Sequence, residues 1–324
     1  MMIWLILAIL SYFILAFVNI GDKIVLGKTD FNPKSYVFYC SLFGALVFLL
    51  IPFLPDVLYS QTGIAVALLA GFIFNIGMYW FFKALSKFDV SQIVPATNGV
   101  MPIFTYLFIS LWASIWPHVF DFKPFTYWQA IAFALLLLGI FLINISKEYK
   151  INFQSAFTSG IAALLFSFAF SLMKGSYLFF NGIVGNWHVL GLNIPLNFLT
   201  AFFWIKAGGL IFAMVMLLDK ELRENFSFNN VGIRKSLGMV TLVQVGGMTS
   251  SLLQDLAIFL APASFVAVVN ASQGTQYVFL MVLVYVISRF KPNIMQEDFS
   301  APVLIRKLIA TSFIIAGLAI FALK

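Results

Sequence analysis

Apolar residues occur along this chain in long continuous runs and not in alternation with polar ones. Ten runs are long enough to form membrane-spanning helices, which need about 20 apolar residues each. They are Met2–Leu26, Tyr36–Leu54, Thr62–Leu85, Val90–Trp116, Phe125–Ile145, Ser155–Phe180, Leu196–Leu218, Leu237–Leu260, Ala263–Ser288 and Ile305–Leu323. Barrel strands would alternate between apolar and polar positions. The pattern therefore predicts an all-α polytopic membrane protein with ten transmembrane helices.

Composition agrees with this prediction. Of the 324 residues, 62% are hydrophobic and 10% are charged, and the mean hydropathy is +1.01. Soluble domains are about 45–50% apolar and about 25% charged. The first run lacks a basic start and a following cleavage motif, so it is expected to be a retained helix. We expect an integral multi-pass protein of the cell membrane whose loops are too short to hold a soluble catalytic domain.

The two halves of the chain share features in the same order. The segment Ala84–Ser91 matches Ala257–Ser264 at an offset of 173 positions, Lys23 near the end of run one matches Lys174 in run six, and runs five and ten each carry a glycine. These matches predict a first five-helix repeat at residues 1–146, a linker at 147–154 and a second repeat at 155–324. Because five is odd, the second copy is inverted, which is a transporter architecture with the substrate site between the halves.

The chain resembles the drug/metabolite transporter superfamily, and within it the ten-helix EamA-type transporters. The resemblance rests on the five-plus-five pattern, the short turn Lys87–Val90 before Ser91, and Pro95 and Pro102 in run four. It implies secondary transport of metabolites, often export, through a central cavity shared by both halves. Many members carry a Glu soon after helices four and nine. This chain has none in those places, so no role of that Glu carries over.

Lys and Arg are distributed unevenly between the loops. The net charge is +7, which in a soluble protein would suggest a nucleic-acid partner. Here fifteen of the 19 Lys and Arg fall in loops after odd-numbered runs, and two fall on the other side. The positive-inside rule then places the odd-numbered loops in the cytoplasm and both termini outside. The family resemblance implies the opposite. We expect the lipid bilayer, and no nucleic acid, as the surrounding partner.

The sequence offers little for enzyme chemistry. It contains two His, His118 and His188, and one Cys, Cys40. No zinc-protease, nucleophile-elbow or P-loop motif is present. A metal site needs several such ligands to converge. We therefore expect no enzymatic activity, no metal and no cofactor.

Neutral polar residues inside the runs are the substrate-path candidates. In run nine, Asn270, Gln273 and Tyr277 fall on one helix face, and we expect that face to lie opposite Asn98. Individually such residues are also explained as hydrogen-bonding contacts between helices. Pro95 and Pro102 predict kinks in run four. The full set of substrate-path candidates is Asn75, Tyr79, Thr97, Asn98, Gln244, Asn270, Gln273 and Tyr277.

Ionisable residues inside the runs suggest a gating device. We expect one ion pair in each half between its first and third helices, Asp22 with Lys83 and Lys174 with Asp255. A partner lowers the cost of a buried charge. The alternative is that all four extend separately to the headgroups. Lys206 lies nearest the centre of its run, where a shift in helix register would explain it equally well.

These features predict a secondary transporter, and by family resemblance an exporter, of small metabolites such as amino acids or amphipathic solutes. It would work by alternating access. Asp22 and Asp255 are the candidates for proton coupling. The alternative is a non-transporting polytopic membrane protein, either an intramembrane enzyme or a scaffold. A third possibility, a channel, is not supported, because the sequence contains no selectivity-filter or charged-ring motif.

Overall fold

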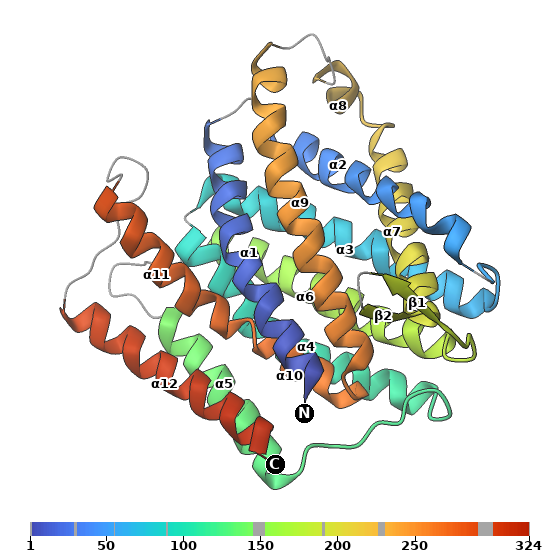
Figure 1. Ribbon diagram of the computed structural model, residues 1–324. Coiled ribbons are helices and arrows are strands. Elements are labelled where there is room, and N and C mark those ends of the chain that lie inside the picture. The colour runs from blue at the N-terminus through green and yellow to red at the C-terminus, as the bar shows by residue number, and fades with distance from the viewer. Residues whose placement is uncertain are drawn as a thin grey trace.

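The computed structural model describes residues 2–28, 31–54, 56–88, 90–144, 153–189, 192–225, 231–290 and 301–323. Each of the ten apolar runs forms one helix or a series of two or three helical segments (Figure 1). The first half contains α1 (Ile3–Lys28), α2 (Pro33–Phe43) with the 3₁₀ segment η1 (Gly44–Phe53), α3 (Gln61–Lys87), α4 (Val90–Ile115) and α5 (Tyr127–Asn144). The second contains α6 (Phe153–Phe179), α7 (Leu196–Met216), α8 (Lys220–Asn225), α9 (Val231–Leu260), the 3₁₀ turn η2 (Ala263–Phe265), α10 (Val266–Ala271), α11 (Gly274–Phe290) and α12 (Ala301–Leu323).

Local sequence signals fix several helix starts. Asn32 caps α2 by accepting a hydrogen bond from the Ser35 backbone N–H at 2.7 Å, with Pro33 in the first position. Ser60 caps α3 in the same way through the Gly63 N–H at 3.1 Å. Both are preferred N-cap residues because their side-chain oxygens satisfy a free backbone donor. The loops before these two helices therefore end where the sequence supplies a cap.

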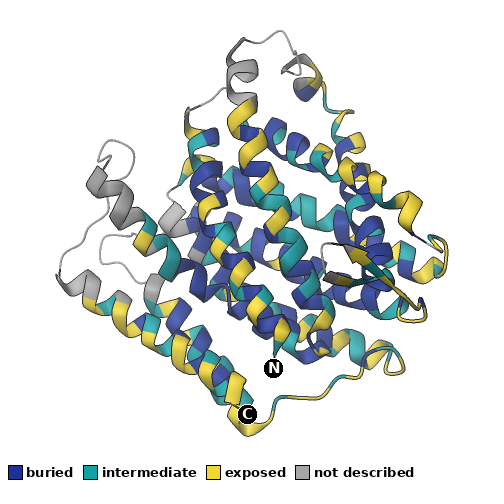
Figure 2. Cartoon of the chain, viewed as in Figure 1, coloured by how far each residue is buried: buried dark blue, intermediate teal, exposed yellow. Residues whose placement is uncertain are grey.

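The described residues include six helical segments that are long and apolar enough to cross a membrane. They are Ile3–Gly27, Pro33–Phe53, Gln61–Lys87, Ala96–Ile115, Phe157–Phe179 and Leu196–Met216, with shorter apolar helices at Tyr127–Leu142 and Leu308–Leu323. Exposed positions run along the outward side of α12, and buried positions gather inside the bundle (Figure 2). Many exposed side chains are large and apolar, such as Leu49, Leu242 and Ile315. An apolar outer surface of this kind fits a membrane-embedded protein.

Three parts of the chain differ from the prediction. Run two changes to a 3₁₀ helix from Gly44, and Pro52 near its end has no N–H to donate. Run nine is interrupted at Ser272 and Gln273. The side chains there bond to the helix's own carbonyls, Ser272 Oγ to Val268 at 2.8 Å and Thr275 Oγ1 to Ser272 at 2.7 Å, a pattern that bends helices.

The third difference concerns the connections. The segment after α7 contains the short helix α8, and the connection before α7 forms a hairpin of β1 (Asn186–Val189) and β2 (Leu192–Pro195). Trp187 in this hairpin packs on Phe53 at the end of η1, with ring centroids 5.0 Å apart. Residues 145–152, which include most of the predicted linker, lie outside the described residues. Pro95 and Pro102 both lie inside one continuous helix, α4.

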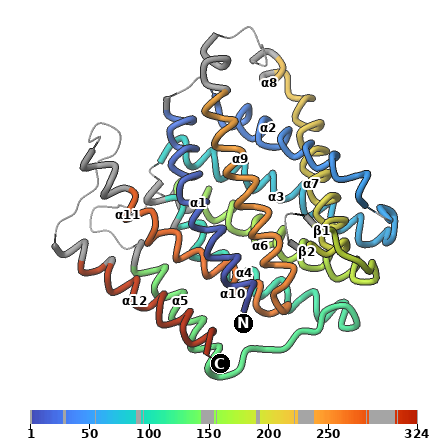
Figure 3. Tube along the Cα trace, viewed as in Figure 1, coloured from blue at the N-terminus to red at the C-terminus, as the bar shows by residue number. Residues whose placement is uncertain are grey.

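The helices pack as three main pairs. α1 lies along α9, α3 lies along α6, and α5 lies along α12 (Figure 3). α1 and α9 are antiparallel, since Ser11 bonds to Ser250 while Gly21, further along α1, faces Val243, which comes earlier in α9. The ends of α1 and α9 therefore lie at opposite ends of the bundle. The two chain termini lie at the same end (Figure 3).

Glycines set the distance between α5 and α12. A Cβ on Gly139 would lie 2.6 Å from Ile314 and 2.8 Å from the Ala310 carbonyl oxygen. A Cβ on Gly317 would lie 2.9 Å from Leu136 and 2.8 Å from the Ala132 carbonyl oxygen. Each glycine thus faces the residues that lie one and two helical turns before the other glycine on the partner helix. This reciprocal contact requires the absence of a side chain at both positions.

This contact predicts opposite effects for two Gly→Ala substitutions. Gly139→Ala should lower the free energy of unfolding in detergent by about 1–3 kcal/mol, because the methyl group meets backbone across a close helix pair. Gly160→Ala in α6 is the control, since a Cβ there meets nothing within 4 Å. That change should be neutral or stabilising by about 0.5–1 kcal/mol, because alanine favours helix. Equal losses of thermal stability for both variants would contradict the packing.

Candidate functional site

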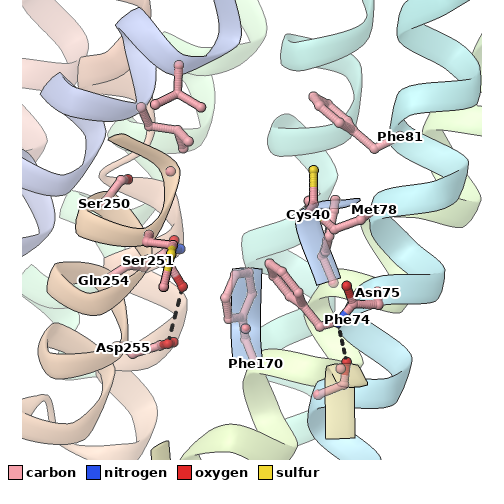
Figure 4. Close-up of a pocket in the computed structure, with 18 of the residues that line it drawn as sticks. Cys40, Phe74, Asn75, Met78, Phe81, Phe170, Ser250, Ser251, Gln254 and Asp255 are labelled. Atoms are coloured by element: carbon pink, nitrogen blue, oxygen red, sulfur yellow. Dashed lines mark hydrogen bonds between the residues drawn. The ribbon is translucent and has the colours of Figure 1, made fainter. Parts of the chain in front are cut away.

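A cavity of about 220 Å³ lies between the α1/α9 pair and the α3/α6 pair. Residues of α2, α4 and α7 complete its wall, and Gln273 reaches it from the break between α10 and α11. Figure 4 shows Ser250, Ser251, Gln254 and Asp255 of α9 on one side, with Phe74, Asn75 and Met78 of α3 on the other. Peripheral α5 and α12 contribute nothing to the described lining. The cavity is therefore central and bounded by both halves of the chain.

One wall of the cavity carries a buried ion pair. Lys206 Nζ on α7 lies 3.2 Å from Asp255 Oδ2 on α9 and donates to Ser251 Oγ at 2.8 Å. The Asp255 side chain is 3% exposed and that of Lys206 is 21% exposed. The Lys206 ammonium also lies 4.8 Å from the centre of the Phe202 ring, a favourable cation–π distance. This pair keeps two opposite charges together beside the cavity.

A second acid lies at the other end of the same cavity. Asp22 is buried near the end of α1 and accepts a 2.5 Å hydrogen bond from the Tyr36 hydroxyl. Gln244 Nε2 in turn donates to Tyr36 Oη at 3.3 Å and to Cys40 Sγ at 2.9 Å. Among the described residues no Lys, Arg or His nitrogen lies within 4 Å of the Asp22 carboxylate. This carboxylate therefore has only neutral partners.

The structure places four of the eight substrate-path candidates at the cavity: Asn75, Asn98, Gln244 and Gln273. The other four, Tyr79, Thr97, Asn270 and Tyr277, do not border it in this conformation. Asn98 and Tyr277 do face each other, since Asn98 Nδ2 donates to Tyr277 Oη at 3.1 Å. Asn270 Nδ2 donates to Thr105 Oγ1 of α4 at 2.9 Å. Residues 270 and 277 thus join α10 and α11 to α4.

Neither of the two expected charge pairs is formed. Asp22 is bonded to Tyr36, and Lys83 lies 4.4 Å from the centre of the Trp80 ring. Asp255 is paired with Lys206. Lys174 instead donates to the carbonyls of Ile258, Phe259 and Ala261 at 3.1, 2.9 and 2.6 Å. The physical reason is that the last carbonyls of a helix lack intrahelical partners and attract a cation.

The same arrangement occurs in the first half. Lys23 Nζ on α1 donates to the carbonyls of Leu85 and Phe88, at the end of α3, at 3.0 and 2.9 Å. Leu85 precedes Ile258 by 173 positions, and Phe88 precedes Ala261 by the same number. Each half therefore links its first and third helices through a lysine. We call these contacts the lysine clamps, one made by Lys23 and one by Lys174.

Sequence reasoning missed two parts of this site. Tyr36 carried no signal, because a tyrosine at the start of an apolar run is ordinary in a membrane helix. The pairing of Lys206 with Asp255 depends on which faces of α7 and α9 meet. The position of Lys206 near the middle of an apolar run was the available signal, since ionisable residues there normally face a partner or a cavity.

Comparisons with known proteins bear on the fold. No family model matches the chain, and no curated protein matches it. Among solved chains 19 match. One, described only as "Crystal structure of protein", has a TM-score of 0.62 and 14% sequence identity, covering 99% of this chain and 95% of that chain. At this identity the likeness shows a shared fold over the whole length.

The buried ion pair predicts a marked loss of stability when one partner is removed. Lys206→Met should lower the free energy of unfolding by about 3–5 kcal/mol, because Asp255 loses its counter-charge. The double variant Lys206→Met, Asp255→Leu should recover most of that loss. Lys123→Met is the control, because its pair with Asp121 is 82% and 85% exposed, and it should change stability by about 0.5 kcal/mol or less. Unfolding in detergent measures all three, and a single variant that behaves like the control overturns the assignment.

Proposed function

We propose that this protein is a secondary transporter that moves small organic solutes across the cell membrane by alternating access, in the manner of EamA-type drug/metabolite transporters. The observation that carries the proposal is the central cavity, which is lined by residues of both halves of the chain and has a buried ion pair in its wall. Its volume is below the roughly 300–1,000 Å³ of pockets for drug-sized ligands. The substrate is accordingly a small metabolite.

An inverted duplication of five helices, with ten spans in all, is part of this proposal. The two lysine clamps support it, because their acceptor carbonyls belong to residues 173 positions apart and each lysine lies on the first helix of its half. The reciprocal glycine contact between α5 and α12 supports it as well, since those are the last helices of the two halves. So does the packing of α1 on α9 and of α3 on α6. If the two halves are exchanged, the α1–α9 contact becomes the α6–α3 contact, and the α5–α12 contact becomes itself.

The lysine clamps supply the gates. The cavity lies between the α1/α9 pair and the α3/α6 pair. Each clamp joins one helix of the first pair to one of the second, and the two clamps lie at opposite ends of the bundle. Opening one mouth separates the pairs at that end and releases its lysine, while the other clamp stays closed. Lys174, with three carbonyls and 4% exposure, holds the tighter closure.

A counterflow assay tests this proposal. Purified protein in liposomes loaded with one solute at a time, from a panel of amino acids, amines and small carboxylates, should accumulate at least one labelled solute against empty-liposome controls. Lys174→Met should slow that uptake about tenfold or more, because one closed state loses contacts of roughly 1.5–3 kcal/mol each. Lys83→Met is the matched control, since its ammonium lies over the Trp80 ring.

Two results would contradict the proposal in different ways. Failure to accumulate any solute, with the protein inserted and monodisperse, argues against transport and favours a scaffold. Uptake that is equal in Lys174→Met and Lys83→Met argues against the clamps as gates and leaves transport standing.

Orientation provides a separate prediction. The excess of Lys and Arg in the loops after odd-numbered runs places both termini outside the cytoplasm. A reporter that is active only in the cytoplasm, fused after Lys324, should therefore give a weak signal. The same reporter inserted after Asn225, beyond α8, should give a strong one. The reverse pattern would favour the orientation that the family resemblance implies.

A further inference from the structure

Three hydroxyl groups outside the described cavity lining already donate their single proton to another group. Tyr36 donates to Asp22 at 2.5 Å, Tyr12 donates to the Val269 carbonyl at 2.9 Å, and Thr105 donates to the Met101 carbonyl at 2.9 Å. A hydroxyl has one proton and can otherwise only accept. Any further group that bonds to one of these oxygens must therefore be a donor.

An amide side chain bonds to each of these oxygens, and its orientation is therefore fixed. Gln244 bonds to Tyr36 Oη at 3.3 Å, Gln254 to Tyr12 Oη at 3.2 Å, and Asn270 to Thr105 Oγ1 at 2.9 Å. In each case the NH₂ end must face the hydroxyl. The carbonyl end is left over.

The leftover ends are acceptors without protein partners. Among the described residues no hydrogen bond reaches Oε1 of Gln244 or Gln254, and both residues line the cavity. Gln273 also lines it, and its Oε1 is buried without a partner, as is Oδ1 of Asn270 behind it. An unsatisfied buried acceptor costs about 1–3 kcal/mol. The oxygens of Gln244 and Gln254 are not closed off in this way, so a ligand that brings donors can bond to them.

The charges of the cavity point in the same direction. Asp255 is balanced by Lys206. The buried carboxylate of Asp22 has no cation within 4 Å among the described residues, although a buried carboxylate normally requires one. The neighbouring Lys23 is bonded to the end of α3. Lys206 retains one N–H beyond its two bonds. Of the two acids that line the cavity, Asp22 is thus the one without a cation beside it among the described residues.

Aromatic and methionine side chains supply the rest of the wall. Phe74, Phe166, Phe170 and Phe202 line the cavity with Met78 and Met173. Rings of this kind favour a cation and an apolar ligand body. The single remaining N–H of Lys206 provides little for a ligand carboxylate.

We propose that the cavity binds a small amphipathic primary amine, with its ammonium group at Asp22 and the free amide oxygen of Gln244, and its apolar part against the phenylalanine and methionine side chains. That the amine is also carried across the membrane rests on the proposed function. The ammonium must bear N–H groups, because a quaternary nitrogen cannot donate to the amide oxygen. An amine without a carboxylate fits better than an amino acid.

Binding to the purified protein tests the class of ligand. The probe is 2-phenylethylamine, compared with its trimethylammonium analogue, 2-phenylethanol, 3-phenylpropionate and phenylalanine. Isothermal titration should give an affinity for the amine at least about tenfold higher than for each of the others, a difference of about 1.4 kcal/mol. Equal affinity for the amine and the alcohol, or tighter binding of the carboxylate or the amino acid, overturns the proposal.

Variants locate the site. Asp22→Asn should weaken amine binding about tenfold or more and leave the weak binding of 2-phenylethanol unchanged. Gln244→Leu should weaken it less and provides a second variant if Asp22→Asn does not fold. Lys123→Ala, in an exposed loop, is the control and should bind like the parent protein. Unchanged amine affinity in both cavity variants places the amine elsewhere and rejects the site.

Counterflow in liposomes separates this proposal from the transport function. Tight amine binding without amine uptake would support the proposed binding site and contradict the proposed transport function. Uptake of phenylalanine or 3-phenylpropionate without amine binding would support the transport function and contradict the proposal that the ligand is an amine.

Discussion

Polar groups inside an apolar bundle must find partners within the protein, and this constraint shapes both ends of the cavity. The last carbonyls of α3 and α9 have no intrahelical donors, and in an apolar medium each unsatisfied group costs several kcal/mol. Lys23 and Lys174 meet this requirement from neighbouring helices. The ammonium groups are held in turn by the negative ends of the helix dipoles. The contacts that hold α1 to α3 and α6 to α9 therefore also satisfy the backbone.

The constraint also explains why the buried acids have different surroundings. Asp255 has a lysine close by, and the pair is held further by Ser251. Asp22 has a tyrosine, and beyond it an amide and a thiol. The first arrangement is neutral without a ligand. The second has no cation within 4 Å among the described residues, and the proposed amine would supply one. The two halves therefore differ in the surroundings of their acids, while the clamps are nearly alike.

The sequence predicted the helices well because continuous apolar runs have one stable arrangement in a membrane, and the ten runs each form helix. It also identified Lys23 and Lys174 as equivalent. It assigned them the wrong partners, because backbone carbonyls leave no trace in a side-chain pattern. The break at Ser272 could not be predicted, since serine and threonine bond either to their own helix or to a neighbour. The pairing of Lys206 with Asp255 depends on how α7 is rotated against α9, which the nearly uniform apolar composition of α7 does not specify.

The second helices of the two halves pack differently, and this difference bears on the proposed alternation. α7 lies directly on α3, where a Cβ on Gly71 would come within 1.8 Å of the Ile205 carbonyl oxygen and one on Gly208 within 2.1 Å of that of Leu68. α2 reaches α9 through side chains, from Tyr36 and Cys40 to Gln244.

Room for a closer contact between α2 and α9 exists. Gly44 and Gly247 both border the cavity, and a Cβ on either would meet nothing nearer than 3.7 Å. Small residues allow helices in a membrane to approach closely. In the proposed alternate state, the junction of α2 and η1 would close on α9 across these glycines as α7 leaves α3. That exchange reproduces the present packing in the other half, so the two states would have similar contacts and similar energies, as a reversible transporter requires.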